Sequence, residues 1–155
     1  MLHALLKLIH VLSVILWVGG MAFVLAFLRP AVATLEPATR VRLMHDVLRR
    51  FLKALLFAVI LVLATGVAMV GLAASQAAAA GGGFRMPASW SAMGGLGVLM
   101  AAIFGHVRMA PYRRLERAMA SADWPAAGAA LGGIRRWVLV NLALGVLVVA
   151  IVLLG

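Results

Sequence analysis

The sequence predicts an all-α protein: an integral membrane four-helix bundle with both termini on the outer side (N-out/C-out). Of its 155 residues, 66% are hydrophobic and only 12% are charged, whereas soluble proteins carry about 25% charged residues. The apolar residues form four long runs, and most basic residues fall between these runs. We expect a single transmembrane domain over residues 1–155. Its helices are expected to cover about 4–28, 52–74, 90–108 and 137–154.

The first crossing contains an ionisable residue in an otherwise apolar run. From Leu8 to Leu28 its only polar residues are Ser13 and His10, and this length matches the roughly 20 residues that a helix needs to span a bilayer. An imidazole is costly to keep inside a membrane, so it calls for a partner or a role. Trp17 follows seven positions later on the same helical face. We predict that His10 is a cofactor or metal ligand and that Trp17 packs against the cofactor.

The distribution of basic residues predicts the orientation. Twelve of the fourteen lysines and arginines lie in two segments, residues 29–53 and 108–136. Such alternation is the positive-inside signature, so these loops are predicted to be cytoplasmic in a bacterial inner membrane. Within them, residues 38–51 and 112–122 form amphipathic segments. We expect the first to be helical and to run into the second crossing, and the second to lie along the membrane surface. The net charge of +10 therefore indicates contact with the lipid bilayer, and not with nucleic acid.

Candidate ligands occur at two depths along the predicted crossings. Helix depth follows from the rise of 1.5 Å per residue. The outer level contains His10, Trp17 and Met93, and the inner level contains His106, His45 and Asn141. His106 has a second interpretation, a hydrogen bond to Asn141 without metal. His45 also has one, a histidine that lies at the level of the lipid headgroups.

These residue types favour metal chemistry over acid–base chemistry. Imidazole and thioether groups hold haem iron and also bind copper, and Cu(I) favours the thioether. The chain has no cysteine, which excludes thiolate sites. Its four carboxylates all lie in the two basic loops, so the crossings carry no hydrolase or transferase signature.

Short motifs along nearly the whole chain resemble the copper-resistance D (CopD) family of membrane proteins, in particular its short four-helix members. The motifs are His10 with Trp17-Val18-Gly19-Gly20, Leu28-Arg29-Pro30, Met93 with Gly97-Val98-Leu99-Met100, His106 with Pro111 and Arg113-Arg114-Leu115, Asp123-Trp124, and Ile134-Arg135-Arg136 with Asn141-Leu142 and Gly145. This resemblance implies the handling of copper.

More distantly, the chain is similar to HemJ, a four-helix protoporphyrinogen oxidase that binds haem b. In that family a histidine of the first helix and a lysine early in the third helix are the implicated haem ligands. His10 matches the histidine, but residues 90–108 contain no lysine. The second ligand of a haem here would therefore be Met93 or another histidine.

Our first hypothesis from the sequence is a membrane protein that binds haem b for one-electron transfer. The ligands or contacts would be His10, Met93, Trp17, His106 and His45, and His10, Met93 and His106 are the candidate metal ligands. The alternatives are copper transport or tolerance, and a cofactor-free structural or assembly subunit. Whether the protein is an enzyme stays open; a haem-dependent oxidoreductase is the class that these residues suit. The expected partners are a redox protein or a quinone, and a second copy of the chain in a homodimer.

Overall fold

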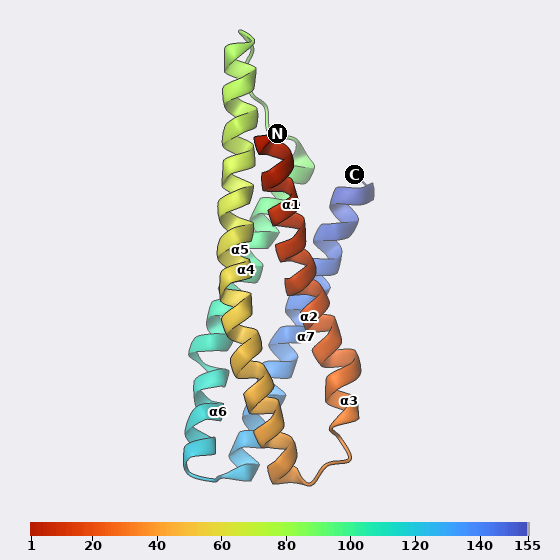
Figure 1. Ribbon diagram of the computed structural model, residues 1–155, viewed down its shortest axis with the longest axis vertical. Coiled ribbons are helices and arrows are strands. Elements are labelled where there is room, and N and C mark those ends of the chain that lie inside the picture. Colours follow the sequence, from red (N-terminus) through yellow and green to blue (C-terminus); the bar gives the residue numbers. More distant parts are fainter. Residues whose placement is uncertain (155) are drawn as a thin grey trace.

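The computed structural model describes residues 1–154, and all regular structure within this range is helical. The first crossing is one rod that contains two π-helical turns, η1 and η2 (Figure 1). Its parts are α1 (Leu2–Val14), η1 (Ile15–Gly19), α2 (Gly20–Phe23), η2 (Val24–Leu28) and α3 (Arg29–Ala31). The remaining helices are α4 (Pro37–Ala79), α5 (Ala88–Met109), α6 (Pro111–Ala120) and α7 (Trp124–Leu154).

Four helical stretches are long and apolar enough to cross a membrane, which confirms the predicted all-α class with four crossings; the orientation stays a prediction. They are Leu2–Ala31, Pro37–Ala79, Ala88–Ala120 and Trp124–Leu154. Many large apolar side chains are exposed on their outer faces. Such exposure suits contact with lipid tails, because a hydrocarbon environment does not penalise it.

The helices extend further than the apolar runs predicted. Residues 38–51 and 52–74 form one continuous helix, α4, as expected of a helical segment that runs into the second crossing. The helix begins where Pro37 occupies its first turn and Glu36 accepts a hydrogen bond from the Thr39 amide (3.1 Å). These are favourable helix-starting residues. The last helix begins at Trp124, well before the predicted residue 137, since Asp123 accepts a hydrogen bond from the Ala126 amide (2.9 Å) and caps it.

The amphipathic segment predicted at 112–122 corresponds to α6, and its expected position along the membrane surface is wrong. The helix packs against the first turns of α7, which it faces after a tight turn. Its apolar stripe is consequently covered by protein, and Leu115 and Ala127 are fully buried (0% exposed). The extension of α7 below the predicted crossing supplies the surface that α6 covers.

The bundle consists of two closely packed helix pairs. The first part of the first crossing, α1, runs beside α4, and α5 runs beside α7. The buried core lies where the pairs meet and includes Trp17, Met21 and Phe104. Small residues allow the pairs to approach. A Cβ atom at Gly145 of α7, for example, would lie 2.9 Å from Val18 Cγ2 of η1.

Candidate functional site

His10 is held by a partner on the neighbouring helix. Its Nδ1 atom lies 2.9 Å from Oγ1 of Thr65, on α4. The Thr65 hydroxyl also donates to the carbonyl oxygen of Leu61, one turn earlier on the same helix. A hydroxyl has one proton to donate. Because that proton is used on the Leu61 carbonyl, Thr65 Oγ1 accepts the hydrogen bond from His10 Nδ1–H.

This hydrogen bond determines which nitrogen of His10 is available. A neutral imidazole with its proton on Nδ1 carries a lone pair on Nε2. The contact with Thr65 engages Nδ1 and not Nε2. The site therefore presents an oriented imidazole whose Nε2 can bind a metal ion or haem iron. In known metal sites a ligating histidine likewise donates its other ring N–H to a neighbouring group.

A small residue makes room for the imidazole ring. Gly66 follows Thr65 on α4, and a Cβ atom there would lie 3.6 Å from His10 Cε1. One turn beyond Thr65, on the same face of α4, is the half-buried Met69. Its thioether is the soft donor nearest in sequence to the Thr65 position. Thr65 and Met69 are not among the residues predicted from the sequence, although their spacing of four residues is a visible sign of a shared face.

The other predicted outer residues do not gather at His10. Trp17 lies in η1 and is buried in the core, where it borders a cavity described below. Met93 is half-buried on α5. The main neighbour of α5 is α7, whereas that of α1 is α4, so helix packing does not bring Met93 beside His10. Their joint role as ligands remains a prediction.

The predicted inner residues are separated as well. His106 is exposed and packs edge-on against Trp137, with ring centroids 4.8 Å apart. The alternative interpretation of His106, a hydrogen bond to Asn141, is not formed through Asn141 Oδ1, which has no partner within residues 1–154. His45 stacks parallel to Tyr112 at 6.0 Å.

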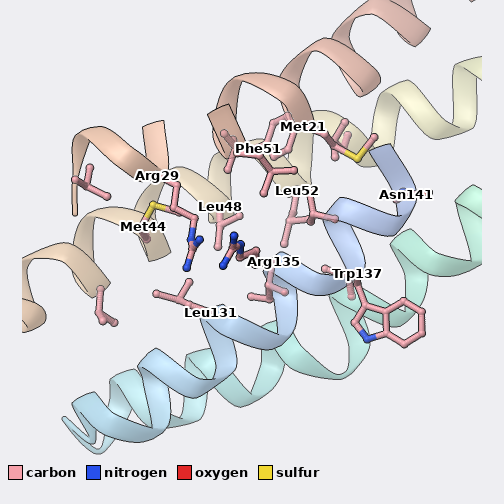
Figure 2. A pocket seen from close by; sticks show the side chains of 18 of the residues that line it. Met21, Arg29, Met44, Leu48, Phe51, Leu52, Leu131, Arg135, Trp137 and Asn141 are labelled. Atoms are coloured by element: carbon pink, nitrogen blue, oxygen red, sulfur yellow. The ribbon is translucent and has the colours of Figure 1, made fainter. Parts of the chain in front are cut away.

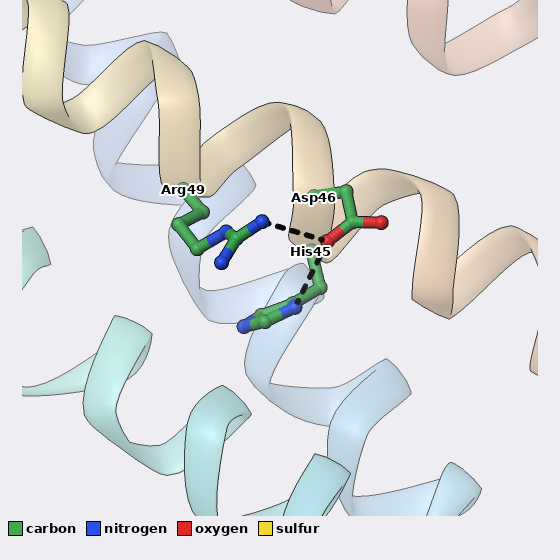
Figure 3. Close-up of polar contacts among 3 residues, drawn as sticks. All are labelled: His45, Asp46 and Arg49. Carbon is green, nitrogen blue, oxygen red and sulfur yellow. Dashed lines mark ion pairs between the residues drawn. The ribbon is translucent and has the colours of Figure 1, made fainter.

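His45 also takes part in a small charged group at the start of α4. Its Nδ1 lies 3.9 Å from Asp46 Oδ1, and Arg49 Nη2 lies 3.7 Å from the same oxygen (Figure 3). Within residues 1–154, no group of three or more histidine and carboxylate side chains is arranged to hold a metal ion. A metal at His10 would thus need thioether or other neutral ligands to complete its shell.

A cavity of about 420 Å³ lies at the basic end of the bundle, between the first crossing, α4 and α7 (Figure 2). Its inner part is mostly apolar and includes Trp17, Met21 and Leu52. Its other end contains Arg29, Arg40 and Arg135, and no carboxylate lines it. Of the predicted site residues, Trp17 lines this cavity, whereas His10, His45, Met93 and His106 do not. The bundle therefore has two chemically different places: a neutral imidazole site on α1 and α4, and a cationic cavity.

The fold and these sites define a helical membrane protein with four crossings and an intramembrane histidine that is held through one ring nitrogen. The chain belongs to the CopD family: the family model described as copper resistance protein D matches residues 45–154. This finding confirms the resemblance stated from the motifs, and the likeness to HemJ stays a prediction. The match begins at His45 and so covers α5 to α7 and most of α4, but not the helix that carries His10. Comparison with curated proteins and with solved structures gave no match.

Proposed function

We propose that this protein handles copper within the membrane and that His10 Nε2 is a copper ligand. Membership of the copper resistance protein D family supports the metal. The observation that carries the site is the Thr65 hydroxyl, which accepts from Nδ1 and not from Nε2. Neutral imidazole together with thioether is a donor set that suits Cu(I).

Each side chain has a separate part in this proposal. His10 supplies the nitrogen donor, and Thr65 holds the ring orientation and its tautomer. Groups that orient a ligand in this way typically change metal affinity about 10- to 100-fold when they are removed. Met69 supplies a soft sulfur donor from the same face of α4. Copper is the cargo here, and no redox step is required for its capture.

Haem b is the second candidate, because the same Nε2 lone pair suits haem iron. It would need a second axial ligand, and the predicted ones, Met93 and His106, lie on a helix whose main neighbour is α7. Copper needs only donors from adjacent turns of α1 and α4. We therefore place copper first and haem-dependent electron transfer second.

The test is a Cu(I) titration of the detergent-purified protein against a chromophoric chelator. We expect His10→Ala to abolish tight binding and Thr65→Val to weaken it about 10- to 100-fold, whereas Thr65→Ser should bind as the wild type does. His106→Ala is the control, a histidine on another helix that should not affect the affinity. Equal copper affinity in His10→Ala and wild type would refute the assignment. An absorption spectrum of the same samples, oxidised and reduced, would show a Soret band if haem is the true ligand.

We also propose that residues 29–53 and 108–136 face the cytoplasm of a bacterial inner membrane. The support is the concentration of basic residues at this end of the bundle. Because the chain lacks cysteine, single cysteines can report accessibility without background. Ser121→Cys should react with a membrane-impermeant maleimide only after the cells are permeabilised, and Ser89→Cys should react in intact cells. The opposite pattern would reverse the orientation.

A further inference from the structure

We propose that the cavity at the basic end of the bundle binds the phosphate headgroup of an anionic phospholipid. The first support is charge. Figure 2 shows the guanidinium groups of Arg29 and Arg135 side by side in the cavity. Neither makes an ion pair among residues 1–154, where the ion pairs involve only Asp46. Two like charges repel, and an anion between them removes that repulsion.

The second support is a pair of buried polar atoms that lack partners. Trp17 is 2% exposed and Asn141 is 4% exposed, and both line the cavity. The indole Nε1 of Trp17 and Oδ1 of Asn141 have no hydrogen-bond partner within residues 1–154. Buried polar groups are rarely left in this state. A ligand could satisfy both atoms. An ester carbonyl of the ligand would accept a hydrogen bond from the indole Nε1, and a hydroxyl or a bound water would donate one to Asn141 Oδ1.

The dimensions and the surroundings fit a lipid. Trp17 precedes Arg29 by twelve residues, which is about 18 Å along a helix. The cavity thus extends from the basic end, where headgroups lie, toward the middle of the crossing. Between these levels its wall is apolar, with Met21, Phe51 and Leu52. A phospholipid matches this order. Its phosphate would lie at the arginines, its glyceryl esters deeper in the cavity, and an acyl chain along the apolar wall.

The same features separate this cavity from the copper site. A volume of about 420 Å³ is far more space than a single metal ion needs. The arginines also repel a cation. The proposal therefore does not depend on the copper assignment and can fail or succeed without it.

The experiment measures lipid retained by the purified protein, using native mass spectrometry after incubation in mixed micelles with phosphatidylglycerol or phosphatidylcholine. We expect the wild type to retain phosphatidylglycerol, and the double variant Arg29→Gln/Arg135→Gln to lose at least tenfold of that binding. Arg113→Gln/Arg114→Gln is the matched control, since it removes the same charge from the exposed face of α6. Equal loss in both double variants, or equal retention of both lipids by the wild type, would overturn the proposal.

Two further measurements distinguish a lipid from a free phosphate ester and test the site without an arginine variant. In the first, millimolar inorganic phosphate is added to the wild type. If phosphate displaces the lipid and itself protects the protein from unfolding, the ligand is a free phosphate ester and the lipid proposal is refuted. Quenching of indole fluorescence by brominated phosphatidylglycerol needs no arginine variant. It should be stronger in the wild type than in Trp17→Phe, and stronger than with brominated phosphatidylcholine. Absence of both differences would also refute the site, even if the arginine variant does not fold.

Discussion

Gly145 is the position where the packing of the bundle is most directly testable. It lies on the buried face of α7, one turn after Asn141. A Cβ atom there would lie 2.9 Å from Val18 Cγ2 and 3.2 Å from Met100 Cε, whereas ordinary contacts begin at 3.4 Å. Gly145→Ala must therefore move η1 and α7 apart by about 0.5 Å at Val18, the difference between those distances. Overpacking of this kind typically costs about 1–3 kcal/mol.

The matched control is Gly132→Ala, on the same helix, where a Cβ atom would meet nothing within 4 Å. Both variants gain the same intrinsic helix propensity, at most about 1 kcal/mol. The difference between them therefore isolates the contact. We expect Gly145→Ala to be less stable than Gly132→Ala by about 1–3 kcal/mol, measured by reversible unfolding with SDS in mixed micelles and followed by circular dichroism.

A double-mutant cycle identifies the clashing partner. Val18→Ala removes both methyl groups that Cβ would approach, so the cost of Gly145→Ala should fall in that background. The coupling energy between the two positions should be about 0.5–3 kcal/mol. Equal stability of Gly145→Ala and Gly132→Ala, or strict additivity with Val18→Ala, would refute the close approach of η1 and α7.

Two further predictions concern the turns at the basic end. Ala122 has a φ of 53° between α6 and α7, so Ala122→Gly should stabilise the protein by about 0.5–1 kcal/mol, and Ser121→Gly should not; equal thermal unfolding temperatures would contradict this. Hydrogen bonds from the backbone amides of Ala38 and Thr39 lower the pKa of Glu36. Its contribution to stability is therefore present above its unfolded pKa, about 4.3, and is lost as the pH falls through the lower folded value. Glu36→Gln should reduce this loss of unfolding free energy in an acid titration.

The sequence predicted the four crossings well because their signal is local. Twenty apolar residues in a row have few alternatives to a membrane helix, and the structure has helices at all four runs. The boundaries were predicted less well, because α4 and α7 continue into polar, basic sequence. In these parts the helices are stabilised by the caps at Glu36 and Asp123 and by the packing of α6. The length of an apolar run does not reveal either contribution.

The partner of His10 was not predicted because it depends on which helices are neighbours. Thr65 is the only polar residue of its crossing between Ala54 and Ala74, and a threonine in the middle of a helix commonly bonds to its own backbone. It does donate to Leu61, and this is the reason that it can only accept from His10. Only the packing of α1 beside α4 turns that backbone bond into a constraint on the imidazole.

Trp17 shows a second limit of sequence analysis, the assumption of a constant helical period. With 3.6 residues per turn, His10 and Trp17 share a face. The π-helical turn η1 contains Trp17, and its wider hydrogen-bond pattern changes the direction of every side chain that follows. His10 consequently contacts α4, while Trp17 and Met21 border the cavity beside α7. The π-helical turn thus lets one helix contribute to two places of opposite chemistry: a neutral nitrogen donor for a soft cation, and the buried wall of a cavity whose arginines favour an anion.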